Sequence, residues 1–181
     1  MQHLLPTQNL RDPAALSRFL LTCLIGLALD QWTKVVAFQK LNTGPYAFIP
    51  GWLHFQITRN PGAVFGIGRG MVAFFIVVSI GAVLFISYLF LNSGRQWFYQ
   101  IILGMLLAGV LGNVIDRIAF GYVRDMIYAI PGRTIAGHEI FPWIFNVADT
   151  MLCTGVFLLL VYSFFQSPHP KTIPPEAQPG S

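Results

Sequence analysis

The chain has 181 residues, of which 55% are hydrophobic and only 10% are charged, and its formal net charge is +4. Because soluble domains carry about 25% charged residues, this composition excludes an ordinary soluble domain and indicates an integral membrane protein. The positive charge reflects a shortage of acids and not a run of lysine and arginine, so nucleic-acid binding has no support. Cys23 and Cys153 both lie in apolar runs, which favours thiols within membrane helices over a disulfide or a metal site.

The first predicted membrane span covers about residues 18–38. Its uncharged run from Phe19 to Leu29 would extend only about 16 Å as a helix, whereas the bilayer core is about 30 Å thick. We therefore extend the helix through "DQWTKVVAF", which brings Asp30 to the membrane boundary and lets Lys34 snorkel to the interface. A cleaved signal peptide is the alternative, but no clear small-x-small cleavage site precedes polar sequence.

Three further apolar runs predict the remaining spans, at about residues 70–91, 96–116 and 147–165. The last run is long enough only if "FPWIFNVAD" supplies its first turns. The third carries Gly104, Ala108 and Gly112 at four-residue spacing, which predicts the close approach of another helix.

The expected organisation is a four-helix membrane domain over residues 18–166 between two tails, 1–17 and 167–181. The tails are polar or rich in proline, and four spans place both of them on one side of the membrane. The positive-inside rule does not orient the bundle, because the two longer loops carry more lysine and arginine than the termini do.

A small β element is predicted between the first two spans. In "GWLHFQITRN", the apolar residues Leu53, Phe55 and Ile57 alternate with polar ones, which is the period of a half-buried strand. The stretch "RNPGAVFGIGRG" then supplies turn residues before the second span. We expect this element to lie on one face of the membrane.

Four of the seven acidic residues lie at or near predicted helix ends on the same side: Asp30, Asp116, Asp125 and Asp149. Ionisable groups at membrane depth are rare and tend to be functional, so four on one face indicate a site. "GNVIDR" and "FNVADT" also resemble each other, and each places an asparagine and an aspartate three residues apart on one helix face. This internal repetition alone would pair Asp116 with Asp149. The structural alternative is that each acid merely caps or ends a helix.

The common nucleophile motifs are missing, since neither G-x-S-x-G, an evident Ser-Lys pair nor H-E-x-x-H occurs. Paired aspartates remain as the candidate catalytic groups. Two close carboxyl groups do not both ionise easily, so one keeps a proton while the other takes a proton from water. This predicts peptide hydrolysis of the aspartic-protease type. A small proton- or ion-coupled transporter and a non-enzymatic scaffold are the alternatives.

Four motifs, "LDQWTK", "RNPGAVFG", "GNVIDR" and "FNVADT", follow in this order from Asp30 to about Gly155. Together they resemble the lipoprotein signal peptidases (signal peptidase II), which are aspartyl proteases of the bacterial inner membrane. The resemblance implies removal of the signal peptide from diacylglyceryl-modified prolipoproteins, just before the lipidated cysteine. It also implies a four-transmembrane-helix bundle with cytoplasmic termini, and a β element and active site near the periplasmic face. No cofactor or metal is implied, the partners are prolipoprotein substrates and membrane lipid, and we expect a monomer.

The resemblance assigns the catalytic pair to Asp149 in "FNVAD" and Asp125 in "GYVRDMI". Residues that bind substrate or support the pair are then expected among Asp30, Asn60, Gly62, Asn113, Asp116, Arg117 and Asn146. The asparagines are expected to hold carboxylates or the substrate backbone, and Arg117 to pair with Asp30 or Asp116. Arg124 precedes Asp125 directly, and neighbours on a strand point to opposite faces.

Overall fold

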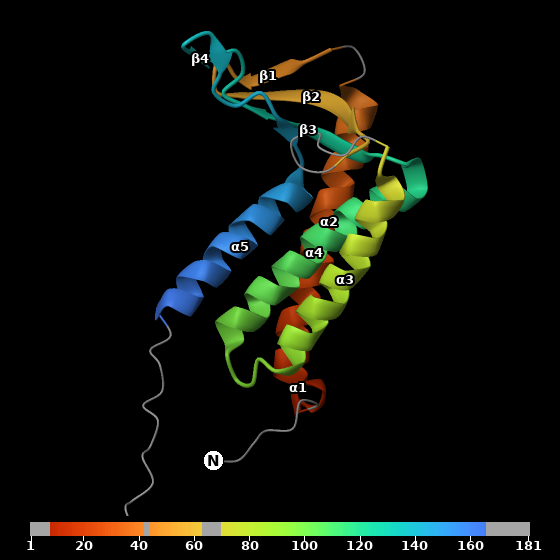
Figure 1. Ribbon diagram of the computed structural model, residues 1–181, viewed down its shortest axis with the longest axis vertical. Helices are drawn as coiled ribbons and strands as arrows, with labels where there is room; N and C mark the ends of the chain where they lie inside the picture. Colours follow the sequence, from red (N-terminus) through yellow and green to blue (C-terminus); the bar gives the residue numbers. More distant parts are fainter. Residues whose placement is uncertain (1–7, 42–43, 63–69, 166–181) are drawn as a thin grey trace, which may run out of the picture.

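The computed structural model describes residues 8–41, 44–62 and 70–165. Figure 1 shows the long helices side by side, with a small sheet across one end of the bundle. Within these residues, four helices are long and apolar enough to cross a membrane: α2 (Pro13–Lys40), α3 (Val72–Leu91), α4 (Trp97–Phe120) and α5 (Val147–Phe165). The expected mainly α membrane fold with four spans is therefore confirmed.

The first long helix starts earlier than the hydropathy pattern predicts. Asp12 caps α2 by accepting a hydrogen bond from the Ala14 amide at 3.0 Å, and Pro13 occupies the first helical position, where its fixed φ is favourable. A short helix, α1 (Gln8–Arg11), precedes the cap. Residues 13–17, expected in the polar tail, are thus helical, whereas residues 1–7 and the tail 167–181 lie outside the described part of the chain.

α4 forms the centre of the bundle. It is the most buried of the four helices, and Figure 1 shows it between α3 and α5 and against α2. A Cβ atom on Gly104 would lie 2.5 Å from the Phe19 carbonyl oxygen, and one on Gly112 would lie 2.5 Å from an oxygen of Asp30. The small-residue stripe therefore permits the close approach of α2, as predicted from its spacing.

The expected β element is the middle of a four-stranded antiparallel sheet with the order β1-β2-β3-β6. Its strands are β1 (Tyr46–Ile49), β2 (Leu53–Asn60), β3 (Val123–Ala129) and β6 (Ile144–Phe145). β2 is half-buried along nearly its whole length and does not alternate. Most of the turn-rich stretch after Pro61 lies outside the described residues.

The polar segment between β3 and β6 contains a second, two-stranded sheet. β4 (Thr134–Ile135) pairs with β5 (His138–Glu139) in a short hairpin. The larger sheet brings the end of α4, through β3, next to the start of α5, through β6. This arrangement places two sequence segments that carry aspartates at one end of the bundle.

Candidate active site

Asp125 and Asp149 meet where the sheet covers the bundle. α4 ends at Gly121, whose φ of 76° is the left-handed conformation that glycine adopts readily, and the chain turns directly into β3. Asp125 is the third residue of that strand and is only 1% exposed. Asp149 lies in the first turn of α5.

The side chain of Asn146 joins the two acids. Its Nδ2 donates to Asp125 Oδ1 at 2.7 Å and to Asn113 Oδ1 at 3.1 Å. Its Oδ1 accepts from the Asp149 amide at 2.9 Å, and its own amide donates to Asp149 Oδ2 at 3.3 Å. A reciprocal pair of this kind also caps α5, so one residue both starts the helix and spaces the carboxylates.

Two further asparagines fix the outer sides of the pair. Asn113, from α4, donates its Nδ2 to Asp149 Oδ1 at 2.8 Å. Asn60, from the end of β2, donates its Nδ2 to Asp125 Oδ2 at 3.1 Å. Each carboxylate is therefore oriented by amide donors from two or more elements, in line with the role expected of these asparagines.

Burial raises the pKa of Asp125 from its ordinary value near 3.8 to about 7, and the negative charge of Asp149 acts in the same direction. The hydrogen bonds from Asn60 and Asn146 oppose this rise, because they favour the ionised form. Asp125 therefore exchanges its proton close to neutral pH, which is the property of a group that moves protons in catalysis.

A buried lysine lies beneath the pair. Lys34 is fully buried, with its Nζ 2.8 Å from Asp30 Oδ2 and 3.3 Å from Asp116 Oδ2. It also donates to Asn113 Oδ1 at 3.2 Å, which turns the amide of Asn113 toward Asp149. The expectation that Lys34 snorkels to the interface is wrong, because two buried carboxylates hold it inside the protein. Its four-residue spacing from Asp30 on one helix was the signal for this pair.

Asp116 belongs to an ion pair and not to the aspartate pair. Arg124 Nη2 lies 2.7 Å from Asp116 Oδ1, and the Arg124 amide donates to Asp116 Oδ2 at 2.9 Å. Arg124 also donates to Gln31 Oε1 at 2.8 Å. As expected for strand neighbours, Arg124 and Asp125 thus have different partners. The pairing of Asp116 with Asp149, which the internal repetition alone would indicate, is not the one observed.

Arg117 does not form the ion pair expected of it. Lys34 and Arg124 occupy the carboxylates of Asp30 and Asp116, whereas Arg117 Nη2 donates to the Gly62 carbonyl oxygen at 2.9 Å. The Gly62 amide in turn donates to Asn60 Oδ1 at 3.0 Å. Arg117 therefore anchors Gly62 just after β2, and motif spacing gave no sign of this contact.

Asp30 ties the first span to the last. Its Oδ1 accepts a hydrogen bond from the Ala148 amide at 2.9 Å, at the start of α5. Its Oδ2 receives Lys34 and, at 3.0 Å, Gln31 Nε2. Asp30 thus supports Asp149 through the helix that carries it, without touching the aspartate pair.

A cavity of about 310 Å³ adjoins the pair between α3, α4 and α5. Most of its polar lining comes from the site described above, Ser79 of α3 adds one hydroxyl group, and its other walls are apolar. The lining residues are Asn60, Phe75, Val78, Ser79, Val110, Asn113, Arg117, Val123, Asp149 and Leu152. Within the described ranges, no group of three or more histidine, cysteine, aspartate or glutamate side chains is placed to hold a metal ion.

The fold and the site define a four-span membrane protein with a buried aspartate pair at one end. The family model described as signal peptidase (SPase) II matches residues 22–165. The chain therefore belongs to the signal peptidase II family and is a membrane enzyme of bacterial type.

Similar proteins match most of the chain. A lipoprotein signal peptidase of Enterococcus faecalis is 37% identical over 146 residues, which are 80% of this chain and 85% of that protein. One of Listeria monocytogenes is 36% identical over 159 residues, 86% of this chain and 98% of that protein. A bacterial membrane enzyme solved by the in meso method at 2.3 Å is 33% identical with a TM-score of 0.70, over 80% of this chain and 85% of that one.

Proposed function

We propose that the protein is an aspartyl endopeptidase that removes the signal peptide from diacylglyceryl-modified prolipoproteins by cleavage before the lipidated cysteine. The observation that carries the proposal is the bridge from Asn146 to both Asp125 and Asp149 at the membrane-facing end of the sheet. Family membership supplies the substrate class, since the similar proteins are lipoprotein signal peptidases.

In the proposed reaction, Asp125 and Asp149 share the proton transfers. A water molecule between them attacks the scissile carbonyl carbon while the ionised carboxylate takes its proton. The protonated carboxyl group, a role that suits Asp125 with its pKa of about 7, donates to the carbonyl oxygen. Collapse of the tetrahedral intermediate breaks the carbon–nitrogen bond, and the proton taken from water passes to the departing amine of the cysteine. The products are the signal peptide with a free carboxylate and the lipoprotein with a free amino-terminal cysteine.

The cavity of about 310 Å³ beside Asp149 is the proposed place for the residues next to the scissile bond. Its apolar walls on α3 and α5 open it toward lipid, where the acyl chains of the substrate remain. Arg117 and Asn60 line its polar end, where their side chains would orient the backbone of the substrate peptide.

The proposed orientation places the sheet at the periplasmic face of the inner membrane and both termini in the cytoplasm. Figure 1 shows α1 and the end of α5 at the end of the bundle opposite the sheet, so the two described ends of the chain share one side. The buried acids gather at the other end, which favours chemistry at a membrane surface over the relay across the membrane that a transporter requires.

The test is cleavage of a purified diacylglyceryl-modified prolipoprotein by the wild type and by Asp→Asn variants. Asp125→Asn and Asp149→Asn are expected to lose at least about 10³-fold in rate, as removal of a member of a catalytic unit does, while keeping the wild-type fold. Asp12→Asn is the matched control, because asparagine caps a helix as well as aspartate does and Asp12 lies at the far end of α2. Substantial cleavage by either of the first two variants would reject the aspartate pair.

A further inference from the structure

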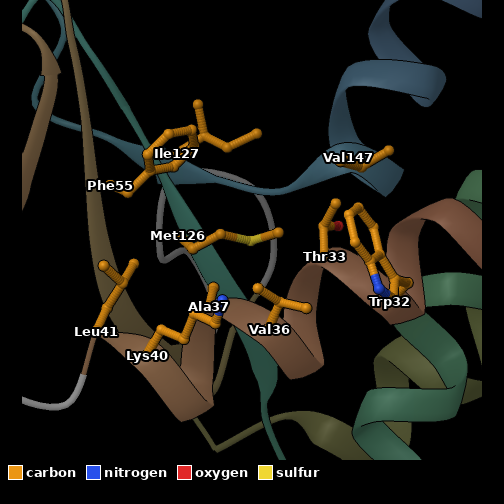
Figure 2. Close-up of a pocket in the computed structure, with 10 residues that line it drawn as sticks. All are labelled: Trp32, Thr33, Val36, Ala37, Lys40, Leu41, Phe55, Met126, Ile127 and Val147. Atoms are coloured by element: carbon orange, nitrogen blue, oxygen red, sulfur yellow. The ribbon is translucent and has the colours of Figure 1, made fainter.

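A second cavity, of about 410 Å³, lies between α2 and the strands β2 and β3. Figure 2 shows its walls: Trp32, Val36 and Lys40 on α2 face Phe55 of β2 and Met126 of β3. None of its lining residues lines the cavity beside Asp149. The proposed peptidase reaction gives it no role.

The length of α2 and the exposure of Trp32 point to a cavity at the depth of the lipid headgroups. α2 has 28 residues and is therefore about 42 Å long, which exceeds the hydrocarbon core of about 30 Å. The excess is enough for its last turns, which carry the cavity wall, to reach past the core at the sheet end. Trp32 is 63% exposed at this level, and tryptophan concentrates at membrane interfaces.

The cavity has a single positive charge at its edge. Of the ten lining residues drawn in Figure 2, only Lys40 is charged, and the other walls are almost wholly apolar. Lys40 is exposed at the end of α2, and among the described residues no carboxylate lies within salt-bridge distance of it. Trp32, Val36 and Lys40 follow at four-residue spacing, so one helix face leads from the hydrocarbon to the cation.

We propose that this cavity holds an acyl chain of an anionic phospholipid whose headgroup phosphate lies against Lys40. An apolar chamber open at interfacial depth accepts a hydrocarbon chain, and a lysine at its rim attracts the negative headgroup. The bound lipid is a structural partner of α2 and β3 and is separate from the substrate, because none of the residues that line its cavity lines the cavity beside Asp149.

Native mass spectrometry of the delipidated full-length protein tests the proposal with dioleoyl phosphatidylglycerol and dioleoyl phosphatidylcholine as probes. The wild type is expected to retain one phosphatidylglycerol and to bind it more tightly than phosphatidylcholine. Val36→Trp fills the cavity and should weaken phosphatidylglycerol binding by at least about tenfold, whereas Val35→Trp, on the neighbouring exposed position, should change it by less than about twofold.

The headgroup contact has its own variant. Lys40→Gln removes the charge and shortens the side chain by one atom, and we expect it to weaken phosphatidylglycerol binding about threefold to tenfold and to remove the preference over phosphatidylcholine. Arg95→Gln, at the exposed turn between α3 and α4, is the matched loss of a cation at the opposite end and should leave both affinities unchanged. Because Lys40 is exposed, this variant remains informative even if Val36→Trp does not fold.

Three results would overturn the proposal: equal loss of binding in Val35→Trp and Val36→Trp, no loss in Val36→Trp, or no preference for the anionic lipid in the wild type. Retention of detergent or of a second protein chain in the cavity in place of phospholipid would overturn it as well. The readout uses no peptide substrate, so its outcome is independent of the proposed peptidase activity.

Discussion

The amide group of Asn113 is held between Lys34 and Asp149, with its oxygen 3.2 Å from the lysine Nζ and its nitrogen 2.8 Å from the carboxylate. Asn146 Nδ2 donates to the same oxygen at 3.1 Å, so the buried cation and Asn146 together turn the nitrogen of the amide toward Asp149. The two ends of an asparagine amide have nearly the same shape, but one accepts hydrogen bonds and the other donates them. Because Lys34 on α2 and Asn146 take the oxygen, the nitrogen is left to donate to Asp149.

Replacement of Asn113 by alanine is expected to lower the cleavage rate by about tenfold to a hundredfold, the range that corresponds to a hydrogen bond to a charged group of about 1.5–3 kcal/mol. The protein should still reach the membrane in normal amounts. Rate measurements with the purified variant check this, with Asn92→Ala, at the end of α3 away from the site, as the control. Unchanged turnover in Asn113→Ala would remove Asn113 from the proposed machinery.

The raised pKa of Asp125 predicts a loss of activity above neutral pH. Because burial and Asp149 raise that pKa to about 7, Asp125 loses its proton as the pH passes through this value, and the pair loses its acid. We expect kcat/KM to fall about tenfold for each pH unit well above 7. A pH–rate profile in buffers of constant ionic strength measures this, and a flat profile from pH 6 to 9 would contradict the assignment.

The same group makes folding stability depend on pH. A carboxyl group whose pKa is raised in the folded protein stabilises that state below its unfolded value of about 3.8, and this contribution is lost as the pH rises to about 7. The loss amounts to at most about 4 kcal/mol for a rise of about three pKa units. The Tm of the wild type should therefore fall between pH 4 and pH 7 by more than that of Asp125→Asn. Parallel curves for the two proteins would count against a buried, protonated Asp125.

Lys34 should be indispensable for folding. Its removal leaves Asp30 and Asp116 as neighbouring buried carboxylates without their shared cation, and the loss of one partner from a buried pair costs about 3–5 kcal/mol. We expect Lys34→Met to lower the Tm in detergent sharply or to prevent accumulation. Lys40→Gln is the control on the same helix, since substitution of an exposed side chain changes stability by about 0.5 kcal/mol or less. A Lys34→Met protein as stable as this control would refute the prediction.

Gly112 should not tolerate even a methyl group. A Cβ atom there would lie 2.5 Å from Asp30 Oδ2 and 3.1 Å from the Ala148 Cβ, so it would separate α2 from α4 at the site. Gly112→Ala is expected to lose both stability and activity. Gly81→Ala in α3 is the matched control, because nothing lies within 4 Å of its Cβ position and alanine favours a helix by about 1 kcal/mol over glycine. The Tm and the cleavage rate of the two variants are measured side by side. Values for Gly112→Ala equal to those for Gly81→Ala would contradict the prediction.

Much of the fold follows from hydropathy, and the gathering of acids at one end follows from the number of spans. The strand at Leu53–Asn60 was likewise visible in the alternation of apolar and polar residues in its sequence, although its burial does not alternate. The partners of the charges were not visible, because ion pairing depends on the distance between helices. Lys34 lies among apolar residues at a helix end, a place typical of snorkelling, but the carboxylates of Asp30 and Asp116 keep it inside the protein.

The partners of Arg117 and Arg124 could not be predicted from the sequence either. Arg117 adjoins Asp116 in the sequence, yet Arg124, which is eight positions from Asp116, forms the salt bridge because the chain reverses at Gly121 and returns along β3. Sequence distance therefore misled the assignment of the arginine partners. The start of α2 was also missed, since a hydropathy pattern does not register the cap at Asp12.

One contact of Asp30 can form only late in synthesis. Asp30 emerges early, but its Oδ1 pairs with the Ala148 amide, which is made more than a hundred residues later. This oxygen therefore lacks its partner until the last helix is in place. A nascent or truncated chain without α5 would carry an unsatisfied carboxylate oxygen on its first membrane span.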